Sequence, residues 1–168
     1  MINQKKFNVL ESECSKCLKC SLSSTRNNVV FGRGNPNSNL FVIGEGPGQQ
    51  EDEQGLAFVG RAGKMLDSAF LSVGIDTNED CYISNIVKCR PPNNRKPLAN
   101  EVKECIPWLN EQIELIKPKV IVLAGSTAVQ SYLNIDEPIS KLRGEWIVRN
   151  DVKSVSYTHL TLPTTTIV

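Results

Sequence analysis

A glutamate and two glycines directly follow a short apolar run in the first third of the chain. The run is Asn39 to Gly44 (NLFVIG), and Glu45, Gly46, Pro47 and Gly48 come next. Glycines let a backbone approach a ligand closely, and proline stiffens the turn. A carboxylate in such a turn can stabilise a developing cation or activate water. By themselves these residues are at least as compatible with an ordinary Gly-Pro turn that carries a solvated glutamate.

A polar residue also interrupts a second apolar run, Cys81 to Val87 (CYISNIV). Asn85 lies there between Ile83 and Ile86, and its amide offers both a hydrogen-bond donor and an acceptor. A strand asparagine that caps a turn is the ordinary alternative. The apolar neighbours favour a functional role, because an amide among them requires a partner.

Cysteines form a second set of residues that could do chemistry. Six are too many for a random cytosolic chain and too few for a disulfide scaffold of this length. An iron–sulfur cluster takes four thiolates, whereas structural zinc and buried free thiols are the alternatives. Cys14, Cys17 and Cys20 form two overlapping C-x-x-C pairs, Cys89 and Cys105 flank a Pro-rich segment, and Cys81 begins an apolar run, which suits a buried thiol.

Composition sets limits on the class of protein. The chain has 168 residues, 40% of them hydrophobic and 22% charged, and a formal net charge of +1. These values predict one globular domain, and any basic surface for nucleic acid must be local. No apolar run reaches transmembrane length, and Met1 to Asn8 lacks the apolar core of a signal peptide. We therefore expect a cytoplasmic protein without membrane partners.

Apolar runs alternate with stretches of helical spacing, which predicts an α/β fold with a parallel sheet covered by helices on both faces. Ligands in such sheets bind beyond the carboxyl ends of the strands. The loops after Gly44, Val87 and Ala124 should therefore converge on one crevice. The expected strands are 39–44, 81–87 and 119–124, with a further turn and strand at 142–148, and the expected helices are 61–73, 101–116 and 125–132.

Several longer motifs resemble family 4 uracil-DNA glycosylases, the iron–sulfur kind. Val30 to Asp67 (VFGRGNPNSNLFVIGEGPGQQEDEQGLAFVGRAGKMLD) and Ile83 to Pro97 (ISNIVKCRPPNNRKP) resemble the family's two signatures. CSKCLKCSLSSTR resembles its N-terminal cluster segment, and the likeness extends from Cys14 to about Val155. The resemblance implies a three-layer sandwich with a central four-stranded parallel sheet. It also implies a monomeric enzyme that hydrolyses the N-glycosidic bond of uracil in DNA and so starts base excision repair.

For the cysteines, the resemblance implies a [4Fe–4S] cluster held by Cys14, Cys17, Cys89 and Cys105. Such a cluster would join distant segments and lower the entropy of the unfolded chain, as a disulfide does. A structural role is expected, because a glycosylase needs no electron transfer. Cys20 leaves the register of the ligands open, since it forms its own C-x-x-C pair with Cys17.

For the site, the resemblance makes Glu45 the catalytic residue, which positions water or stabilises the cationic sugar. Gly44 and Gly46 would contact the substrate, Phe58 would stack on uracil, and Asn85 would read its edge. Cytosine carries an amine where uracil has a carbonyl oxygen, so a fixed amide can distinguish the two bases.

Contacts with DNA phosphates are expected from a basic loop and a helix start. Arg90, Arg95 and Lys96 could bind phosphates, although a solvated basic loop is equally compatible with the sequence. Ser126 is expected to cap a helix, and its backbone could also bind phosphate.

The last residues depart from the family pattern. Val155 to Thr165 (VSYTHLTLPTT) resembles a translated sequencing adapter, so we expect a glycosylase domain at 1–154 and a non-native tail at 155–168. A natural Thr-rich tail is the alternative. His159 is the single histidine and receives no role. The family ends with a strand, a His-Pro-Ser motif, an intercalating loop and a helix. None is recognisable here, so we expect an incomplete sheet and weak or absent activity of this chain, whereas the intact gene product should be active.

Two other functions remain open from the sequence. One is a non-catalytic iron–sulfur module that binds uracil-containing or abasic DNA, and the other is a glycosylase for a different deaminated base. An electron carrier fits poorly, because the cysteine spacing lacks the further motif of ferredoxins.

Overall fold

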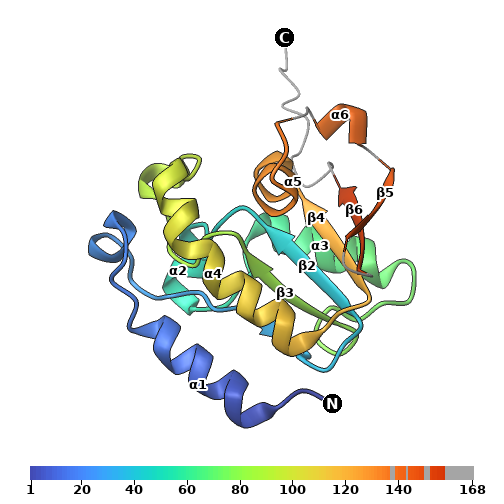
Figure 1. Cartoon of the computed structure of the whole chain (residues 1–168), viewed down its shortest axis with the longest axis horizontal. Helices are drawn as coiled ribbons and strands as arrows, with labels where there is room; N and C mark the ends of the chain where they lie inside the picture. The colour runs from blue at the N-terminus through green and yellow to red at the C-terminus, as the bar shows by residue number, and fades with distance from the viewer. Residues whose placement is uncertain (137–138, 143, 150–151, 158–168) are drawn as a thin grey trace.

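A mixed sheet of six strands forms the centre of the fold among the described residues (Figure 1). The structure is a computed structural model, and it describes residues 1–136, 139–142, 144–149 and 152–157. The strand order is β1-β3-β2-β4-β6-β5. The strands are β1 (Arg33–Gly34), β2 (Leu40–Gly44), β3 (Cys81–Asn85), β4 (Val120–Ala124), β5 (Trp146–Arg149) and β6 (Val152–Tyr157).

Four central strands are parallel, as predicted. β3, β2, β4 and β6 run in one direction, and β1 and β5 pair antiparallel at the two edges. The expectation of an incomplete sheet was wrong, because residues 152–157 form the fourth parallel strand beside β4. The strand predicted within 142–148 is present as β5, which pairs antiparallel with β6 at the edge of the sheet. The sequence of β6, VKSVSY, gives a weak signal because only two of its six residues are aliphatic.

The expected boundary between Ser154 and Val155 falls inside β6. Ser154 is buried, and the pairing with β4 continues through Val155 and Ser156 to Tyr157. Residues 158–168, with His159, lie outside the described residues.

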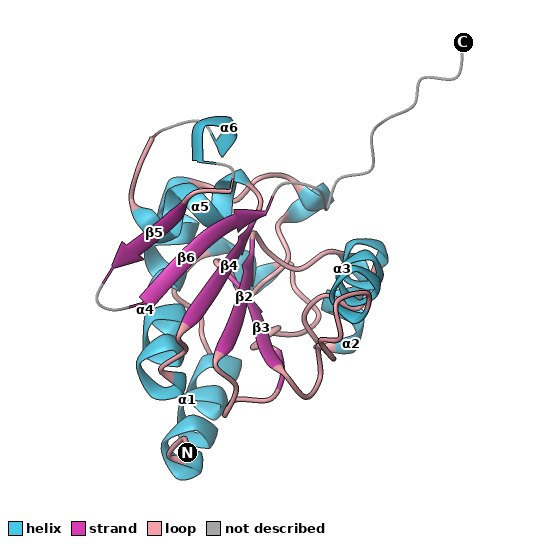
Figure 2. Cartoon of the chain, turned by 90° about the vertical axis from the view of Figure 1, so that its right-hand side faces the viewer, coloured by secondary structure: helices cyan, strands magenta, loops and turns pink. Residues whose placement is uncertain are grey.

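Helices cover both faces of the sheet (Figure 2). One face carries α1 (Gln4–Ser15), α4 (Ala99–Ile116) and α5 (Ser126–Leu133), and the other carries α2 (Gln49–Gln54) and α3 (Arg61–Leu71). Short helical turns occur at Ser21–Ser24, Pro92–Asn94 and Ile139–Leu142 (α6). None of the described helices is long and apolar enough to cross a membrane.

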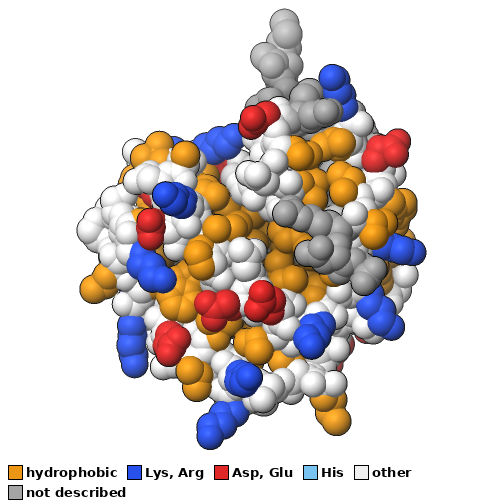
Figure 3. Space-filling model, in the orientation of Figure 1, with side chains coloured by type: hydrophobic (Ala, Val, Ile, Leu, Met, Phe, Trp, Pro, Cys, Tyr) orange, Lys and Arg blue, Asp and Glu red, His pale blue; other side chains and the backbone are white. Residues whose placement is uncertain are grey.

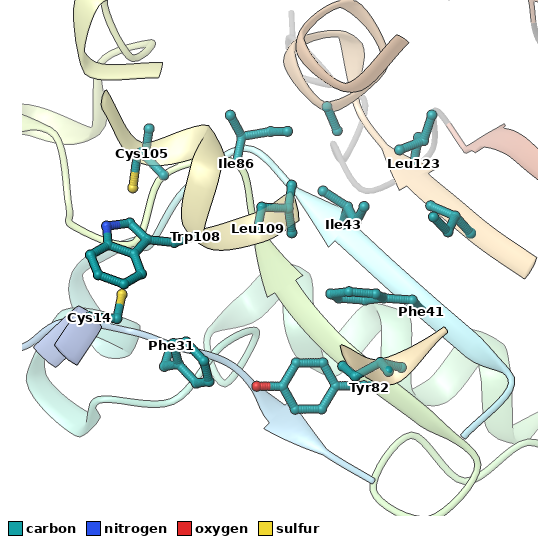
Figure 4. Close-up of a cluster of buried hydrophobic side chains, with 14 of the residues drawn as sticks. Cys14, Phe31, Phe41, Ile43, Tyr82, Ile86, Cys105, Trp108, Leu109 and Leu123 are labelled. Carbon is teal, nitrogen blue, oxygen red and sulfur yellow. The ribbon is translucent and has the colours of Figure 1, made fainter. Parts of the chain in front are cut away.

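The alternation of side chains along β2 divides the core in two. Phe41 and Ile43 join the cluster under α1, α4 and α5, whereas Val42 packs on the opposite face with Leu66 of α3. The first cluster is drawn in Figure 4, where Phe41 and Ile43 lie on the same side of β2 as Leu109 of α4.

A buried carboxylate ties the start of α4 to two loops. Glu101 is fully buried, and Arg95 donates to both of its oxygens over 2.7 and 2.8 Å. The Ser21 hydroxyl and the Leu98 backbone N–H donate to the same carboxylate. The pKa of Glu101 is lowered to about 2, mainly by the hydrogen bonds from Arg95. Burial acts in the opposite direction, and the hydrogen bonds from Leu98 and Ser21 lower the pKa further. Glu101 thus joins the segment after the N-terminal cysteines, through Ser21, to the Pro-rich segment between Cys89 and Cys105, through Arg95.

Replacing Glu101 with Gln should lower the free energy of unfolding by about 2 kcal/mol at pH 7, because the buried partners lose a charged acceptor. The carboxylate has a depressed pKa in the folded state, so its contribution is present above pH 4.5 and is lost as the pH falls toward 2. Urea titrations of wild type and Glu101→Gln from pH 7 to pH 3 should show the gap closing with acid. A gap that stays constant would contradict this account.

Candidate active site and cysteine cavity

A cleft of about 580 Å³ lies at the carboxyl ends of β2, β3 and β4. Its size is that of an ordinary small-ligand site. The predicted convergence of three loops is confirmed, because the cleft is lined by residues after β2, after β3 and after β4. They are Glu45, Gly46, Pro47, Gly48, Glu51, Phe58, Gly60, Arg61, Ala62, Asn85, Pro91, Asn94, Arg95, Ala124, Gly125, Ser126 and Tyr157.

The register of β2 and β3 places Asn85 directly opposite Gly44. A Cβ on Gly44 would come within 2.4 Å of the Phe58 ring and 2.6 Å of Asn85 Oδ1. The glycine therefore leaves the space in which the ring and the amide meet. Asn85 is 1% exposed, and its Oδ1 has no hydrogen-bond partner among the described residues. A buried acceptor without a partner is costly, and here it belongs to a residue that lines the cleft.

Phe58 is held in a strained conformation. Its φ is +52°, which is unusual for a residue with a side chain. Arg33 donates to the carbonyls of Ala57 and Phe58 over 2.7 and 3.2 Å and pairs with Asp67 at 2.6 Å. A Cβ at Gly63 would lie only 1.8 Å from the Phe58 carbonyl oxygen. The loop that presents the ring is thus fixed from two sides.

Two carboxylates line the cleft, and their hydrogen bonds differ. Glu51 accepts from the backbone N–H groups of Gly48, Val59 and Gly60 over 3.2, 3.0 and 2.7 Å. It therefore joins the Glu45 loop to the Phe58 loop. Glu45 accepts at Oε2 from the Thr127 hydroxyl, which is the single hydrogen-bond partner of this carboxylate within the described part of the chain. Glu45 is consequently the carboxylate with an oxygen left for a ligand.

The basic residues expected to bind phosphate occupy different surroundings. Arg95 lines the cleft, but its guanidinium is paired with Glu101. Arg90 donates to Asn94, and Lys96 approaches Gln130 at 3.5 Å; neither lines the cleft. Ser126 is exposed and lines it. On the face drawn in Figure 3, acidic and basic side chains are interspersed.

Five of the six cysteines line a second, small cavity. Cys14, Cys17, Cys20, Cys89 and Cys105 come from the N-terminal segment, the end of the β3 loop and α4. Cys81 lies in the other core and donates to the Thr77 carbonyl. Among the described residues, no three Cys, His, Asp or Glu side chains come close enough together for a single metal ion. Five thiols around one cavity nevertheless offer the donors that a larger cluster uses.

Hydrogen-bond donors surround these sulfurs. The Lys88 backbone N–H donates to Cys105 Sγ at 3.2 Å, and Arg26 donates to Cys89 Sγ at 3.4 Å. Trp108 lines the cavity, and its buried indole N–H has no partner among the described residues. Figure 4 shows Cys14 and Cys105 beside this ring. An orphan donor and donated N–H···S bonds suit a group that carries further sulfur acceptors.

Burial raises the pKa of the Cys14 thiol to about 12 and that of Cys105 to about 11. Thiols in such surroundings stay protonated at neutral pH unless a metal displaces the proton, so they are poor nucleophiles. The chemistry of this donor set is that of ligands.

Lys88 connects the cysteine cavity to the cleft. Its ammonium is buried and donates to Ser84 Oγ, Gln112 Oε1 and the Asn85 carbonyl over 2.6, 2.6 and 2.9 Å. Because the Asn85 carbonyl is one of these acceptors, Lys88 links the end of β3, which carries the amide, to Gln112 of α4.

Comparison with known proteins identifies the family. Residues 31–166 match the model of the uracil DNA glycosylase superfamily. The chain is 43% identical to the type-4 uracil-DNA glycosylase of Thermotoga maritima over 143 aligned residues. The alignment covers 83% of this chain and 74% of that protein. It is 43% identical to the type-4 enzyme of Archaeoglobus fulgidus (79% of this chain, 68% of the relative) and 42% to that of Saccharolobus solfataricus (86% and 68%).

The chain belongs to the type-4 uracil-DNA glycosylase family. The resemblance noted in the sequence is thereby confirmed. Gly44 lies against the Phe58 ring and the Asn85 amide. The predicted site residues that line the cleft are Glu45, Gly46, Phe58, Asn85, Arg95 and Ser126.

Four further residues at this site were missed by sequence reasoning. Arg61, Asn94 and Tyr157 line the cleft, and Thr127 binds Glu45. Arg61 begins a helix and Asn94 lies in a loop, so no periodicity marks them. Thr127 could have been suspected only from its place in the first turn after a predicted strand.

Replacing Gly44 with Ala should lower the free energy of unfolding by about 2 kcal/mol, because the new methyl group overlaps the Phe58 ring and the Asn85 amide. Chemical denaturation measures the loss. The double variant Gly44→Ala/Phe58→Leu should recover part of it, since the nearest overlapping atoms belong to the ring. A single variant as stable as wild type would show that the ring and amide are not confined here.

Proposed function

We propose that this protein hydrolyses the N-glycosidic bond of uracil in DNA and so starts base excision repair. The observation that supports this most directly is a buried amide, an aromatic ring and a carboxylate in one cleft, from Asn85, Phe58 and Glu45. The family membership of the chain supports the same activity.

The base must leave the duplex to reach such a cleft. Phe58 would stack on the flipped uracil. Asn85 Oδ1 would accept from uracil N3–H, and its NH₂ would donate to O4. Cytosine carries an unprotonated nitrogen and an amine at these places, so both contacts would fail and the buried acceptor would remain unpaired. The missing partner of Asn85 Oδ1 is thereby explained.

Glu45 acts on the sugar. As the glycosidic bond lengthens, positive charge develops on the deoxyribose and negative charge on the departing base. A carboxylate held at Oε2 by Thr127 can direct its other oxygen toward that cation or toward the attacking water. Glu51 is engaged by three backbone N–H groups and shapes the loops instead.

The DNA backbone would contact the rim of the cleft. We assign phosphate contacts to Arg90, Lys96 and the backbone of Ser126 at the start of α5. Arg95 contributes less in this proposal, because Glu101 already binds its guanidinium.

The cysteine cavity is proposed to hold a [4Fe–4S] cluster through Cys14, Cys17, Cys89 and Cys105. When bound, the cluster would supply a cross-link between the N-terminal segment, the β3 loop and α4 rather than a reaction step. The orphan indole N–H of Trp108 and the donors to Cys89 and Cys105 support this assignment. A cytoplasmic monomer is also part of this proposal, as the family resemblance implies.

Replacing Asn85 with Ala should slow uracil release about 100-fold or more, since the base loses its orienting contacts. A single-turnover assay on a duplex with a central U·G pair measures the rate. Asn110→Ala, which removes an exposed amide on α4, should react like wild type. Tight binding of uracil-containing DNA by the wild type with no free uracil would favour a non-catalytic binding module instead.

Replacing any one of the four proposed ligands with serine should lower the iron content and the visible absorption of protein purified anaerobically. The four are Cys14, Cys17, Cys89 and Cys105. Cys81→Ser is the matched control, because Cys81 is buried like Cys14, Cys89 and Cys105 but lies away from the cavity. Cys20→Ser tests the register. If it loses iron while Cys17→Ser does not, the assignment of Cys17 is wrong, and zinc in the wild type would exclude the cluster.

A further inference from the structure

The first turn of α5 places a buried hydroxyl against the proposed catalytic carboxylate. Thr127 Oγ1 donates to Glu45 Oε2, across 82 positions of sequence. The Thr127 residue is 3% exposed, whereas Glu45 is half-buried and lines the cleft. The contact joins the loop after β2 to the helix after β4, which are two of the three segments that converge on the cleft.

Thr127 suits a fixed donor. A β-branched side chain in a helix has few rotamers, and the burial of Thr127 restricts it further. A threonine in the helix interior can bond to the carbonyl one turn earlier, but Thr127 is the second residue of α5 and donates to Glu45 instead.

We propose that Thr127 is a positioning residue. Its hydroxyl fixes the orientation of the Glu45 carboxylate, so that the other oxygen of Glu45 faces the cationic sugar or the attacking water. This inference rests on the proposed glycosylase function. Without the hydroxyl, the Glu45 carboxylate would sample other rotamers, since this carboxylate has no other hydrogen-bond partner in the described part of the chain. Small displacements of a catalytic group reduce rates strongly.

The other charged groups at the cleft do not replace this contact. Glu51 is committed to backbone N–H groups, and Arg95 is paired with Glu101. Arg61 and Tyr157 line the cleft from α3 and β6. Within the described residues, Thr127 is the group that donates to the Glu45 carboxylate, so the orientation of that carboxylate depends on Thr127.

The test is a double-mutant cycle with single-turnover uracil release as the readout. Thr127→Val should lower the rate constant about tenfold, with the enzyme concentration for half-maximal rate changed less than about twofold. Thr127→Ser should restore the rate to within about threefold of wild type. In a Glu45→Ala background, Thr127→Val should have no further effect, because there is no carboxylate left to orient.

Ser38→Ala is the matched control for loss of a buried hydroxyl. Ser38 donates to the Leu40 carbonyl at the opposite end of β2 from Glu45. It should lower the midpoint of thermal unfolding about as much as Thr127→Val does, with the rate unchanged.

The outcomes separate the two claims. If the wild type releases no uracil, the proposed function falls and this inference falls with it. If the wild type is active but Thr127→Val keeps its rate, only the role of Thr127 is overturned. The same holds if Thr127→Val slows the Glu45→Ala variant as much as it slows wild type, since the hydroxyl would then act only through general stability.

Discussion

The parallel pairing of β2 with β3 is the constraint on which the site depends. It sets Gly44 opposite Asn85, and both residues stand at the carboxyl ends of their strands. A shift by one residue would turn the Asn85 side chain to the other face of the sheet. It would also bring a residue with a side chain under the Phe58 ring. The register therefore decides at once where the amide points, where the ring can lie and where the Glu45 loop begins.

Polar residues buried beneath the sheet hold this register from the other side. Lys88 binds the Asn85 carbonyl, and its other partners, Ser84 and Gln112, both contact the Phe31 carbonyl. Burial lowers the pKa of Lys88 to about 8. A buried amine is costly unless every proton finds an acceptor. Here the three acceptors belong to three different residues. The next residue along the chain is Cys89, so the segment that anchors the amide also enters the cysteine cavity.

Much of this arrangement could be predicted from the sequence, because it follows from strong local patterns. The apolar runs at 39–44, 81–87 and 119–124 are strands fixed by burial on both faces, and their order along the chain places their ends together. The strand β6 was missed, because VKSVSY is held by pairing with β4 rather than by its own hydrophobicity. Thr127 was missed for a related reason: its contact with Glu45 crosses 82 positions of sequence and leaves no local trace.

Two acidic residues in the cleft have different hydrogen-bond environments. Glu45 and Glu51 are six positions apart and both line it. Three backbone N–H groups bind Glu51, and such a carboxylate is satisfied and fixed. Glu45 receives one hydroxyl and faces the space beside a strained aromatic residue and an amide oxygen without a partner. Unpaired groups and backbone strain are unfavourable for folding, so their concentration around one cleft indicates that a ligand completes them. In the proposed function, a flipped deoxyuridine would supply a base ring against Phe58, an N3–H donor for Asn85 Oδ1 and, beside Glu45, a sugar that becomes cationic.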